Sequence, residues 1–539
     1  MIGLKLKGGV MTRNRLAVLA GLTLSAALGA AFAQGRGGRG DQLPPDMTNP
    51  GASRGRGGPE SQAQLNAAAG QMEQARRGPE PVEKSVVTHH SARIAGQTIN
   101  YTATAATYVL KDESDTPKAT FFFVAYTKDG VDDIAKRPLS FVYNGGPGSG
   151  SLFTHMGLGP RRAVLTSDGH GMPAPYSVVD NDDSFLDASD LVFVDAIGTG
   201  YSRPAPGQAT AQFYGVVQDA NWFADFIYQY ISRNERWASP KFLIGESYGT
   251  TRSAELAGVI QQRHQIYLNG VVLLSSVAFS SWGADDRSIF FLPTYVMTAW
   301  YHHLLPSDLQ KENAESVAQA ARLFAHGEYA AALEKGDQLT PAERQKVVQD
   351  LARFTGLSTK YIEESNLRIS PARWFKELER DKRKTIGRLD SRFEGMDADA
   401  AGERDEYDPS EASYEGAYAA TFHDYARREL GWKTETPYLI SGRVQPWDRT
   451  GGDQAGEVLR SAMTQQTNLR LLVLCGYYDV ATPFNGIEET VSHMGLEPSV
   501  RKNVSFTYYE SGHMIYIDRK AHDKLHKDVD DFINASYPH

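Results

Sequence analysis

Residues 241–250 read KFLIGESYGT, a segment that joins an apolar run, a serine motif and the start of a helical pattern. An apolar run ends at Ile244, the motif G-x-S-x-G follows around Ser247, and an amphipathic stretch continues to Gln262. The two glycines of the motif permit a strained turn from a strand to a helix, which lifts the serine hydroxyl above the end of a sheet. This turn, the nucleophile elbow, is typical of the α/β-hydrolase fold. Because the bare motif arises easily by chance in a chain rich in glycine and serine, the rest of the sequence is needed to decide whether Ser247 is a nucleophile.

Short apolar runs and helical patterns alternate on both sides of this elbow. The helical patterns include residues 218–231 and 248–262, and the runs read PLSFVYN, LVFVDA, KFLIG, GVVLLSS and LRLLVLCG. Continuous apolar strands that alternate with helices predict an α/β fold, a mostly parallel sheet with helices on both faces. Upstream, residues 86–128 carry the pattern of antiparallel strands. Catalytic groups on such a sheet are expected at the carboxyl ends of the strands.

The interval from Trp282 to Trp432 breaks this alternation. It contains three helical patterns of mixed charge, KENAESVAQAARLFAHGEYAAALEKG, PAERQKVVQDLARFTG and PARWFKELERDKRKTIGRL, and then an acidic, glycine-rich stretch. We expect a helical cap inserted between two halves of the sheet, with strands resuming at TPYLISG and LRLLVL. The predicted domains are a first core part at 83–281, the cap at 282–432 and a second core part at 433–539.

A serine nucleophile needs a base, and the base needs a carboxylate that orients it. In the α/β-hydrolase fold the chain order is serine, acid, histidine. Asp479 directly follows the run LRLLVLCGYY, and His513 lies just after the run NVSFTYY. Each residue taken alone has an ordinary interpretation, as a turn carboxylate or a loop histidine. Their order and their positions after strands favour a catalytic triad of Ser247, Asp479 and His513.

An oxyanion hole requires two backbone N–H groups that converge on a developing negative charge. The first is expected from Tyr248, the residue after the nucleophile. The second is expected from a glycine-rich loop after an early strand, and NGGPG (144–148) follows PLSFVY in that position. Gly146 is the predicted donor. A phosphate-binding loop is the alternative, but GGPGSG lacks the lysine of a P-loop and does not match the dinucleotide motif G-x-G-x-x-G.

Five segments together closely resemble the serine carboxypeptidase family. They read NGGPGSGS, DAIGTGYSRP, IGESYGT, YYDVATPF and SGHMIY, and the resemblance extends from about residue 85 to the end of the chain. It implies the triad and the oxyanion hole described above, and peptides as substrates. It further implies a group that holds the C-terminal carboxylate of the peptide: Asn144, Gly145 and Glu246.

Glu246 has a physical reason for this role that does not depend on the family. A carboxylate beside the nucleophile would repel an anionic substrate, but enclosure in a cleft raises the pKa of a carboxyl group. A protonated Glu246 donates a hydrogen bond to the substrate carboxylate, so acid-favoured activity is expected. The chain departs from the family at three places, with Ser149 and Gly150 instead of cysteine and serine, Met156 and Gly157 where a further glutamate is common, and Tyr477 instead of an aspartate.

The N-terminus predicts export. Basic residues precede an apolar run from Leu16 to Ala33 that ends in Ala-Phe-Ala, so we expect a signal peptide at 1–33 that is cleaved near Ala33, with no stable membrane insertion afterwards. A retained membrane anchor is the alternative. Residues 34–82 are dominated by glycine, arginine and proline and predict a disordered linker.

The composition limits which cellular compartment and which partners are expected. The 539 residues carry a formal net charge of -9, which gives little support to a nucleic-acid role. The single cysteine, Cys475, excludes an intramolecular disulfide and fits a bacterial periplasmic or secreted protein. The sequence leaves the oligomeric state open.

No cofactor and no required metal are expected. The sequence holds no HExxH motif, and the adjacent pair His302–His303 has no obvious partner ligands. His522 and His526 lie four apart on an expected helix, where a solvated face is the favoured interpretation. His155 is expected either in the cleft or on the surface.

Three functions remain open at this point. A carboxypeptidase is favoured, while an esterase or acyltransferase would use the same machinery with another leaving group or acceptor. A catalytically silent binding protein is the third alternative, although the complete set of serine, acid, histidine and oxyanion elements speaks against it.

Overall fold

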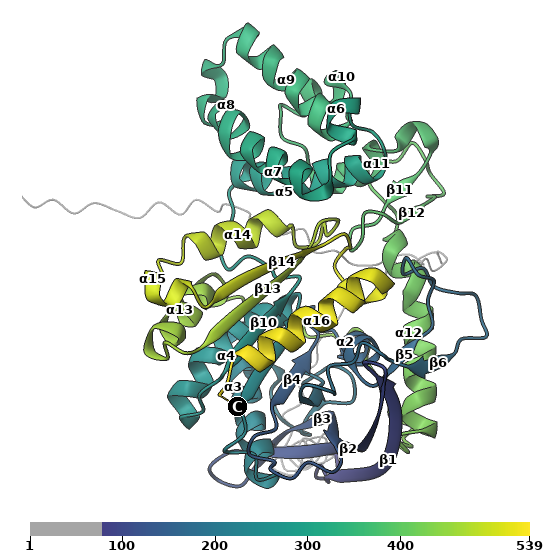
Figure 1. The fold of residues 1–539 in the computed structure, drawn as a ribbon, viewed down its shortest axis with the longest axis vertical. Helices are drawn as coiled ribbons and strands as arrows, with labels where there is room; N and C mark the ends of the chain where they lie inside the picture. The colour runs from purple at the N-terminus through teal and green to yellow at the C-terminus, as the bar shows by residue number, and fades with distance from the viewer. Residues whose placement is uncertain (1–77, 539) are drawn as a thin grey trace, which may run out of the picture. The chain divides into compact units, whose positions relative to one another are not determined.

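A ten-stranded sheet lies at the centre of the described chain (Figure 1). The computed structural model describes residues 78–538. Along the sheet the strands follow the order β1-β2-β3-β7-β4-β9-β10-β13-β14, and β8 pairs with β3. The strands span β1 (Lys84–Ile94), β2 (Gln97–Lys111), β3 (Pro117–Lys128), β4 (Leu139–Tyr143), β7 (Asp190–Val194), β8 (Arg203–Pro204), β9 (Lys241–Glu246), β10 (Gly270–Leu274), β13 (Arg470–Gly476) and β14 (Val504–Tyr509).

The sheet has an antiparallel edge and a parallel centre. β1, β2 and β3 pair antiparallel with one another, and β3 pairs antiparallel with β7. From β7 across to β14 every neighbouring pair is parallel. This arrangement is the α/β-hydrolase fold that the sequence predicts. Two small antiparallel pairs lie outside it, β5 (Arg161–Ala163) with β6 (Val178–Asp180) and β11 (Thr385–Ile386) with β12 (Glu394–Gly395).

Helices cover both faces of the sheet, which explains why its parallel strands read as continuous apolar runs. On β9, Leu243 packs into one hydrophobic core with residues of α3, α4 and α13. Its neighbours Phe242 and Ile244 point to the other face and pack into a second core with residues of α16 and α2. These helices span α2 (Leu152–Leu158), α3 (Val216–Arg233), α4 (Tyr248–His264), α13 (Ala455–Gln465) and α16 (Arg519–Ala535).

Between β10 and β13 the chain leaves the sheet and forms the helical segment α5 to α12 (Figure 1). Its helices span α5 (Ala284–Tyr301), α6 (Ser307–Gln310), α7 (Ala314–Phe324), η2 (Ala325–Tyr329), α8 (Ala330–Lys335), α9 (Pro341–Thr355), α10 (Thr359–Glu364), α11 (Pro371–Glu377) and α12 (Pro409–Arg428). The helix expected at 371–389 is wrong beyond Glu377. Arg383 has a φ of 58°, which a right-handed helix does not tolerate, and the chain then forms β11. The domain boundaries at 282 and 432 stay a prediction.

The strand expected at TPYLISG is also wrong. Leu439 and Ser441 form only isolated bridges, with Gly200 and Ser149. Pro437 carries no N–H group and cannot donate to a ladder of hydrogen bonds. The segment therefore lies against the loop that follows β4 and does not extend the sheet.

The predicted signal peptide at 1–33 and residues 34–77 of the predicted linker lie outside the described residues. In the part of the chain from 78 to 538, no helix has both the length and the apolar character needed to cross a membrane. The remaining helices span η1 (Thr210–Gln212), η3 (Gly336–Gln338), η4 (Arg380–Lys382), η5 (Gly452–Gln454), α14 (Phe484–Ser492), α15 (Pro498–Arg501) and η6 (Ile515–Ile517).

Candidate active site

Ser247 occupies the turn between β9 and α4. Its φ of 59° and ψ of -128° lie in a region that residues with a Cβ rarely adopt, so the turn is strained. A Cβ on Gly245 would lie 2.2 Å from the carbonyl oxygen of Gly249, and only glycine permits this close approach. Ser247 N donates to Leu274 O at 3.0 Å, which anchors the turn to the end of β10. Ser247 is half-buried, while the residues on either side of it are buried.

Asp479 and His513 form a buried pair just beyond the ends of β13 and β14. His513 Nδ1 donates to Asp479 Oδ2 at 2.7 Å, and Nε2 is therefore the acceptor when the ring is neutral. Burial alone lowers the pKa of His513, but the attraction of Asp479 and Glu246 outweighs it, so that pKa is raised. Asp479 Oδ1 accepts from the backbone N–H groups of Ala481 and Thr482, both at 2.9 Å. The carboxylate is held from two sides.

Ser247 follows β9 and His513 follows β14, with β10 and β13 between these strands, and no hydrogen bond joins the two side chains. Ser275, which follows β10, donates from Oγ to the backbone oxygen of His513 at 2.6 Å. The side-chain hydrogen bonds of His513 within residues 78–538 go to Asp479 and Thr482, and none goes to the Ser247 hydroxyl. Such a contact commonly tightens only when a substrate is bound. His513 is therefore tied to the end of β10, the strand beside β9, but it makes no hydrogen bond to the predicted nucleophile.

The NGGPG loop packs directly on the elbow. A Cβ on Gly145 would lie 2.4 Å from the backbone nitrogen of Tyr248, so a glycine is required there. Gly146 follows with a φ of 102°. In the described chain, the N–H groups of Gly146 and Tyr248 donate to no other backbone group. The two predicted oxyanion donors are thus brought near one another with no backbone partner of their own.

A buried ion pair behind the elbow holds the same loop. Arg252 Nε donates to Asp219 Oδ2 at 2.7 Å, and both side chains are almost fully buried. Arg252 Nη1 also donates to the backbone oxygen of Asn144 at 2.8 Å, and the Tyr248 hydroxyl donates to Asp219 at 3.1 Å. Burial raises the pKa of Asp219 although Arg252 opposes the rise. This network ties α4 to the loop that follows β4.

The segment DAIGTGYSRP contributes a buried carboxyl group, that of Asp195, which connects three segments near the NGGPG loop. Asp195 accepts from Ser151 N at 2.8 Å, from Tyr201 N at 3.1 Å and from the Tyr438 hydroxyl at 2.8 Å. Burial raises the pKa of Asp195. Asp195 joins the end of the NGGPG loop to the turn after β7 and to the TPYLISG segment.

Asn144 and Glu246 are in direct contact. Asn144 Nδ2 donates to Glu246 Oε1 at 2.7 Å, and Asn144 Oδ1 accepts from the backbone and the hydroxyl of Thr154, both at 3.0 Å. Burial raises the pKa of Glu246 to about 7, although His513, Tyr516 and Asn144 lower it. Glu246 Oε2 has no hydrogen-bond partner among the described residues. Below neutral pH this carboxyl group is therefore protonated, with one oxygen free to donate.

Tyr516 is a residue of this site that the sequence did not reveal. It lies in η6, three residues after His513, and it is buried. Its ring packs on Gly157, where a Cβ would lie 2.3 Å from the ring atom Cδ2. Its hydroxyl interacts with Glu246. The contact joins α2 to η6, segments far apart in the chain, and no local sequence pattern signals it.

The helical segment supports the acid and the base through one loop. Val480 N donates to the backbone oxygen of Arg388 at 3.1 Å, and His513 N donates to that of Leu389 at 2.6 Å. The loop lies between α11 and α12, at the end of the segment 371–389 that the sequence predicts as a helix. Backbone support of this kind has no side-chain signature.

The interpretations of two histidines are wrong. His522 is only 2% exposed on the apolar face of α16, and burial lowers its pKa well below the usual value. His155 lies in the core, where its Nε2 is 2.6 Å from the Tyr126 hydroxyl and its ring stacks on Phe193. Burial lowers the pKa of His155 to about 3, so it stays neutral. Both are packed residues of the core.

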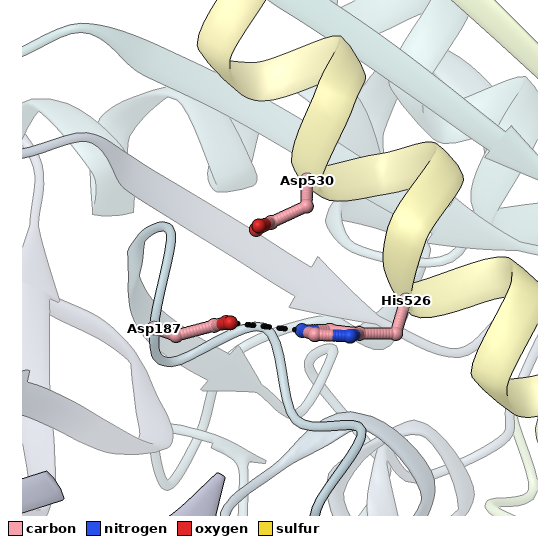
Figure 2. Close-up of side chains that lie close together, drawn as sticks. All are labelled: Asp187, His526 and Asp530. Atoms are coloured by element: carbon pink, nitrogen blue, oxygen red, sulfur yellow. Dashed lines mark hydrogen bonds and ion pairs between the residues drawn. The ribbon is translucent and has the colours of Figure 1, made fainter. Parts of the chain in front are cut away.

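Two groups of side chains in the described chain have donor atoms close enough together to hold a metal ion: Asp187, His526 and Asp530, and His302, Glu379 and Glu394. Figure 2 shows that His526 and Asp530 project from α16 toward Asp187. His526 Nε2 lies 3.0 Å from Asp187 Oδ2, and burial, with repulsion from Asp187, raises the pKa of Asp530 to about 6. In the second group Lys382 donates to Glu379 at 2.7 Å, and His302 lies 3.4 Å from Glu394. Most of these side chains pair within the protein, while Asp530 Oδ1 and Glu379 Oε2 are buried without a hydrogen-bond partner in the described chain, and we assign no metal to either group.

Comparison with known proteins gives one family. The family model described as serine carboxypeptidase matches residues 97–521. No curated protein sequence matches the chain. Solved structures with a similar fold include the proline iminopeptidase of Mycobacterium smegmatis, with 13% identity, a TM-score of 0.34 and coverage of 80% of this chain and 98% of that one. A carboxyl esterase of Bacillus coagulans has 13% identity and a TM-score of 0.35, with coverage of 80% and 97%. An esterase of Thermogutta terrifontis has 12% identity and a TM-score of 0.33, with coverage of 80% and 99%.

Proposed function

Because the chain belongs to the serine carboxypeptidase family, we propose that it releases C-terminal amino acids from peptides through an acyl-enzyme on Ser247. The observation that carries this proposal is the buried pair of His513 and Asp479 beside the strained turn at Ser247. A serine hydroxyl at such a turn, next to a histidine held by a carboxylate, has what acyl transfer requires.

The first half of the proposed reaction forms the acyl-enzyme. Ser247 Oγ attacks the carbonyl carbon of the last peptide bond, and its proton passes to His513 Nε2. The N–H groups of Gly146 and Tyr248 stabilise the negative charge that develops on the carbonyl oxygen. The C–N bond then breaks, and His513 gives the proton to the departing amine. Asp479 keeps the imidazole oriented and stabilises its positive charge.

The second half releases the shortened peptide. Water attacks the acyl ester while His513 takes one of its protons, and that proton returns to Ser247 Oγ as the ester bond breaks. Ser247 and His513 are then back in their starting protonation states, and the net reaction is hydrolysis of the peptide bond.

Recognition of the substrate terminus falls to Asn144, Gly145 and Glu246. The short contact between Asn144 and Glu246 and the raised pKa of Glu246 support this assignment. A neutral carboxyl group donates to a carboxylate, whereas an ionised one repels it. The same machinery without this recognition would serve an esterase or an acyltransferase, and the free C-terminus is therefore the discriminating feature.

We also propose that the protein works outside the cytoplasm, in the periplasm or the medium. The basic start followed by the apolar run to Ala33 supports export. Cleavage is checked by sequencing the N-terminus of the protein recovered from the periplasmic and culture fractions, where a start near Gln34 is expected. Full-length protein held in the membrane fraction would contradict this localisation.

One experiment tests the activity. Wild type and Ser247→Ala are incubated with an N-blocked dipeptide, with its C-terminal amide and with a simple acyl ester. The expected result is cleavage of the peptide bond in the acid, with release of the free amino acid, much faster than cleavage of the same bond in the amide, which releases the amino-acid amide. Both activities should be lost in Ser247→Ala. Turnover of the ester alone would instead establish an esterase.

A further inference from the structure

Two buried polar atoms beside the elbow lack hydrogen-bond partners. They are Oε2 of Glu246 and the hydroxyl oxygen of Tyr516, and neither makes a hydrogen bond of normal geometry within residues 78–538. The two side chains are nevertheless close enough that the Tyr516 hydroxyl lowers the pKa of Glu246. Buried polar groups without partners are uncommon, because each has given up its hydrogen bonds to water. Two such groups side by side, next to a nucleophile, point to a ligand that satisfies both.

Packing fixes the position of the Tyr516 hydroxyl. The side chain is 4% exposed, and its ring is pressed on the backbone of Gly157. Any side chain at position 157 would enter the space of this ring, since even a Cβ would come within 2.3 Å. The hydroxyl is therefore presented from a rigid seat, which is what a recognition group requires.

We propose that Tyr516 is a specificity-determining residue that donates a hydrogen bond from its hydroxyl to the C-terminal carboxylate of the substrate, next to Glu246. The inference rests on the proposed carboxypeptidase function and names a further recognition group for it. A carboxylate has two oxygens and accepts several hydrogen bonds, so it can accept from Tyr516 and from a protonated Glu246 together. Hydrogen bonds to an ionised acceptor are stronger than those between neutral groups.

The two donors respond differently to pH. The other titratable groups that interact directly with this pair are His513, Asp479, Tyr414, Tyr418 and His522. Burial holds the pKa of Tyr516 well above its usual value, and the nearby Glu246 raises it further. Tyr516 thus keeps its proton at any pH where the protein is assayed, whereas Glu246 loses its own. Recognition of the free C-terminus is consequently weakened but not abolished above neutral pH.

The test compares Tyr516→Phe with wild type on the N-blocked dipeptide acid and on its C-terminal methyl ester. Loss of one hydrogen bond to a carboxylate is expected to lower kcat/KM for the acid about 10- to 100-fold, mainly through KM. The ester, which offers no carboxylate, should change by less than about threefold. The ratio of the two substrates is the readout, because a purely structural role would lower both equally. An unchanged ratio overturns the proposal.

Tyr295→Phe is the matched control. Tyr295 is also buried, and its hydroxyl also lacks a hydrogen-bond partner in the described chain, but it lies in α5 and packs on Trp374. Removing its hydroxyl should leave the ratio of acid to ester unchanged. Thermal unfolding of both variants checks that each is folded.

A binding measurement separates this inference from the proposed function. Ser247→Ala and the double variant Ser247→Ala/Tyr516→Phe are titrated calorimetrically with an N-acetyl amino acid and with its amide. Weaker binding of the acid, by about 10- to 100-fold, in the double variant supports the role of Tyr516 even where no peptidase activity is found. Equal binding overturns it, while cleavage by wild type would still stand.

Discussion

Asn144 Nδ2 donates a 2.7 Å hydrogen bond to Oε1 of Glu246, so any proton on this carboxyl group resides on Oε2. Above its pKa of about 7 Glu246 becomes a carboxylate that repels the anionic end of a peptide. We therefore expect kcat/KM for an N-blocked dipeptide acid to fall about tenfold between pH 7 and pH 9. Glu246→Gln keeps the contact with Asn144 and has no acidic proton, so its rate should stay level over this range. A fall of the same size in the variant would assign the alkaline limb to another group.

The stability of the folded protein should report the same titration. The pKa of Glu246 is about 7 in the folded state and about 4.5 in an unfolded chain, so the folded state binds more protons between these values. The free energy of unfolding contributed by Glu246 is therefore fully present below about pH 4.5 and is lost as pH rises through 7. We expect Glu246→Gln to gain about 3 kcal/mol over wild type at pH 8, relative to the difference at pH 4. Urea unfolding of both proteins at the two pH values measures this, and a difference independent of pH would contradict it.

Asp479→Asn tests the orientation of the base. In the variant an amide N–H donor faces His513 Nδ1 in place of the carboxylate acceptor. The ring then no longer carries its proton on Nδ1, Nε2 cannot act as the base, and kcat should fall by about four orders of magnitude. The acid limb of the pH profile should also move to lower pH, because Asp479 no longer raises the pKa of His513. Steady-state kinetics from pH 5 to pH 9 measures both effects. A loss below about tenfold would remove Asp479 from the triad.

Gly157→Ala tests the seat of Tyr516. The new methyl group would lie 2.3 Å from the tyrosine ring, so the ring has to move, at a cost of about 1–3 kcal/mol in the free energy of unfolding. KM for the peptide acid should rise while turnover of the matching ester changes little. Gly327→Ala is the control, because nothing lies within 4 Å of a Cβ there. The control should keep its stability or gain up to about 1 kcal/mol. Equal stability and equal KM in the two variants would show that the Tyr516 ring can move at no cost and is not held by Gly157.

The sequence predicts the parts of the site that depend on chain order and strand position. Ser247, Asp479 and His513 were expected after strands, and β9, β13 and β14 do end just before them. Parallel strands end at one edge of a sheet, so the residues that follow them lie at that same edge, regardless of the structure of the chain between the strands. Their catalytic roles stay a prediction that the variants above test.

Other features depend on contacts that no local pattern encodes. The packing of Tyr516 on Gly157 joins two segments that pair only in the folded chain. His522 has the spacing of a polar helix face, yet it is buried because α16 covers one side of the sheet. TPYLISG has the composition of a strand, but its neighbours are loops. In each case tertiary packing overrides the local pattern.

The backbone contact between Leu389 and His513 has a consequence for how this enzyme can be rebuilt. The base takes part of its support from the insertion, and so does Val480, which follows the acid. Exchanging the whole insertion for that of a relative, as is done to transplant substrate preference, would therefore disturb the reaction centre as well. A chimera should keep residues 388–391 from this chain, so that substrate selectivity is altered while the backbone support of His513 and Val480 is retained.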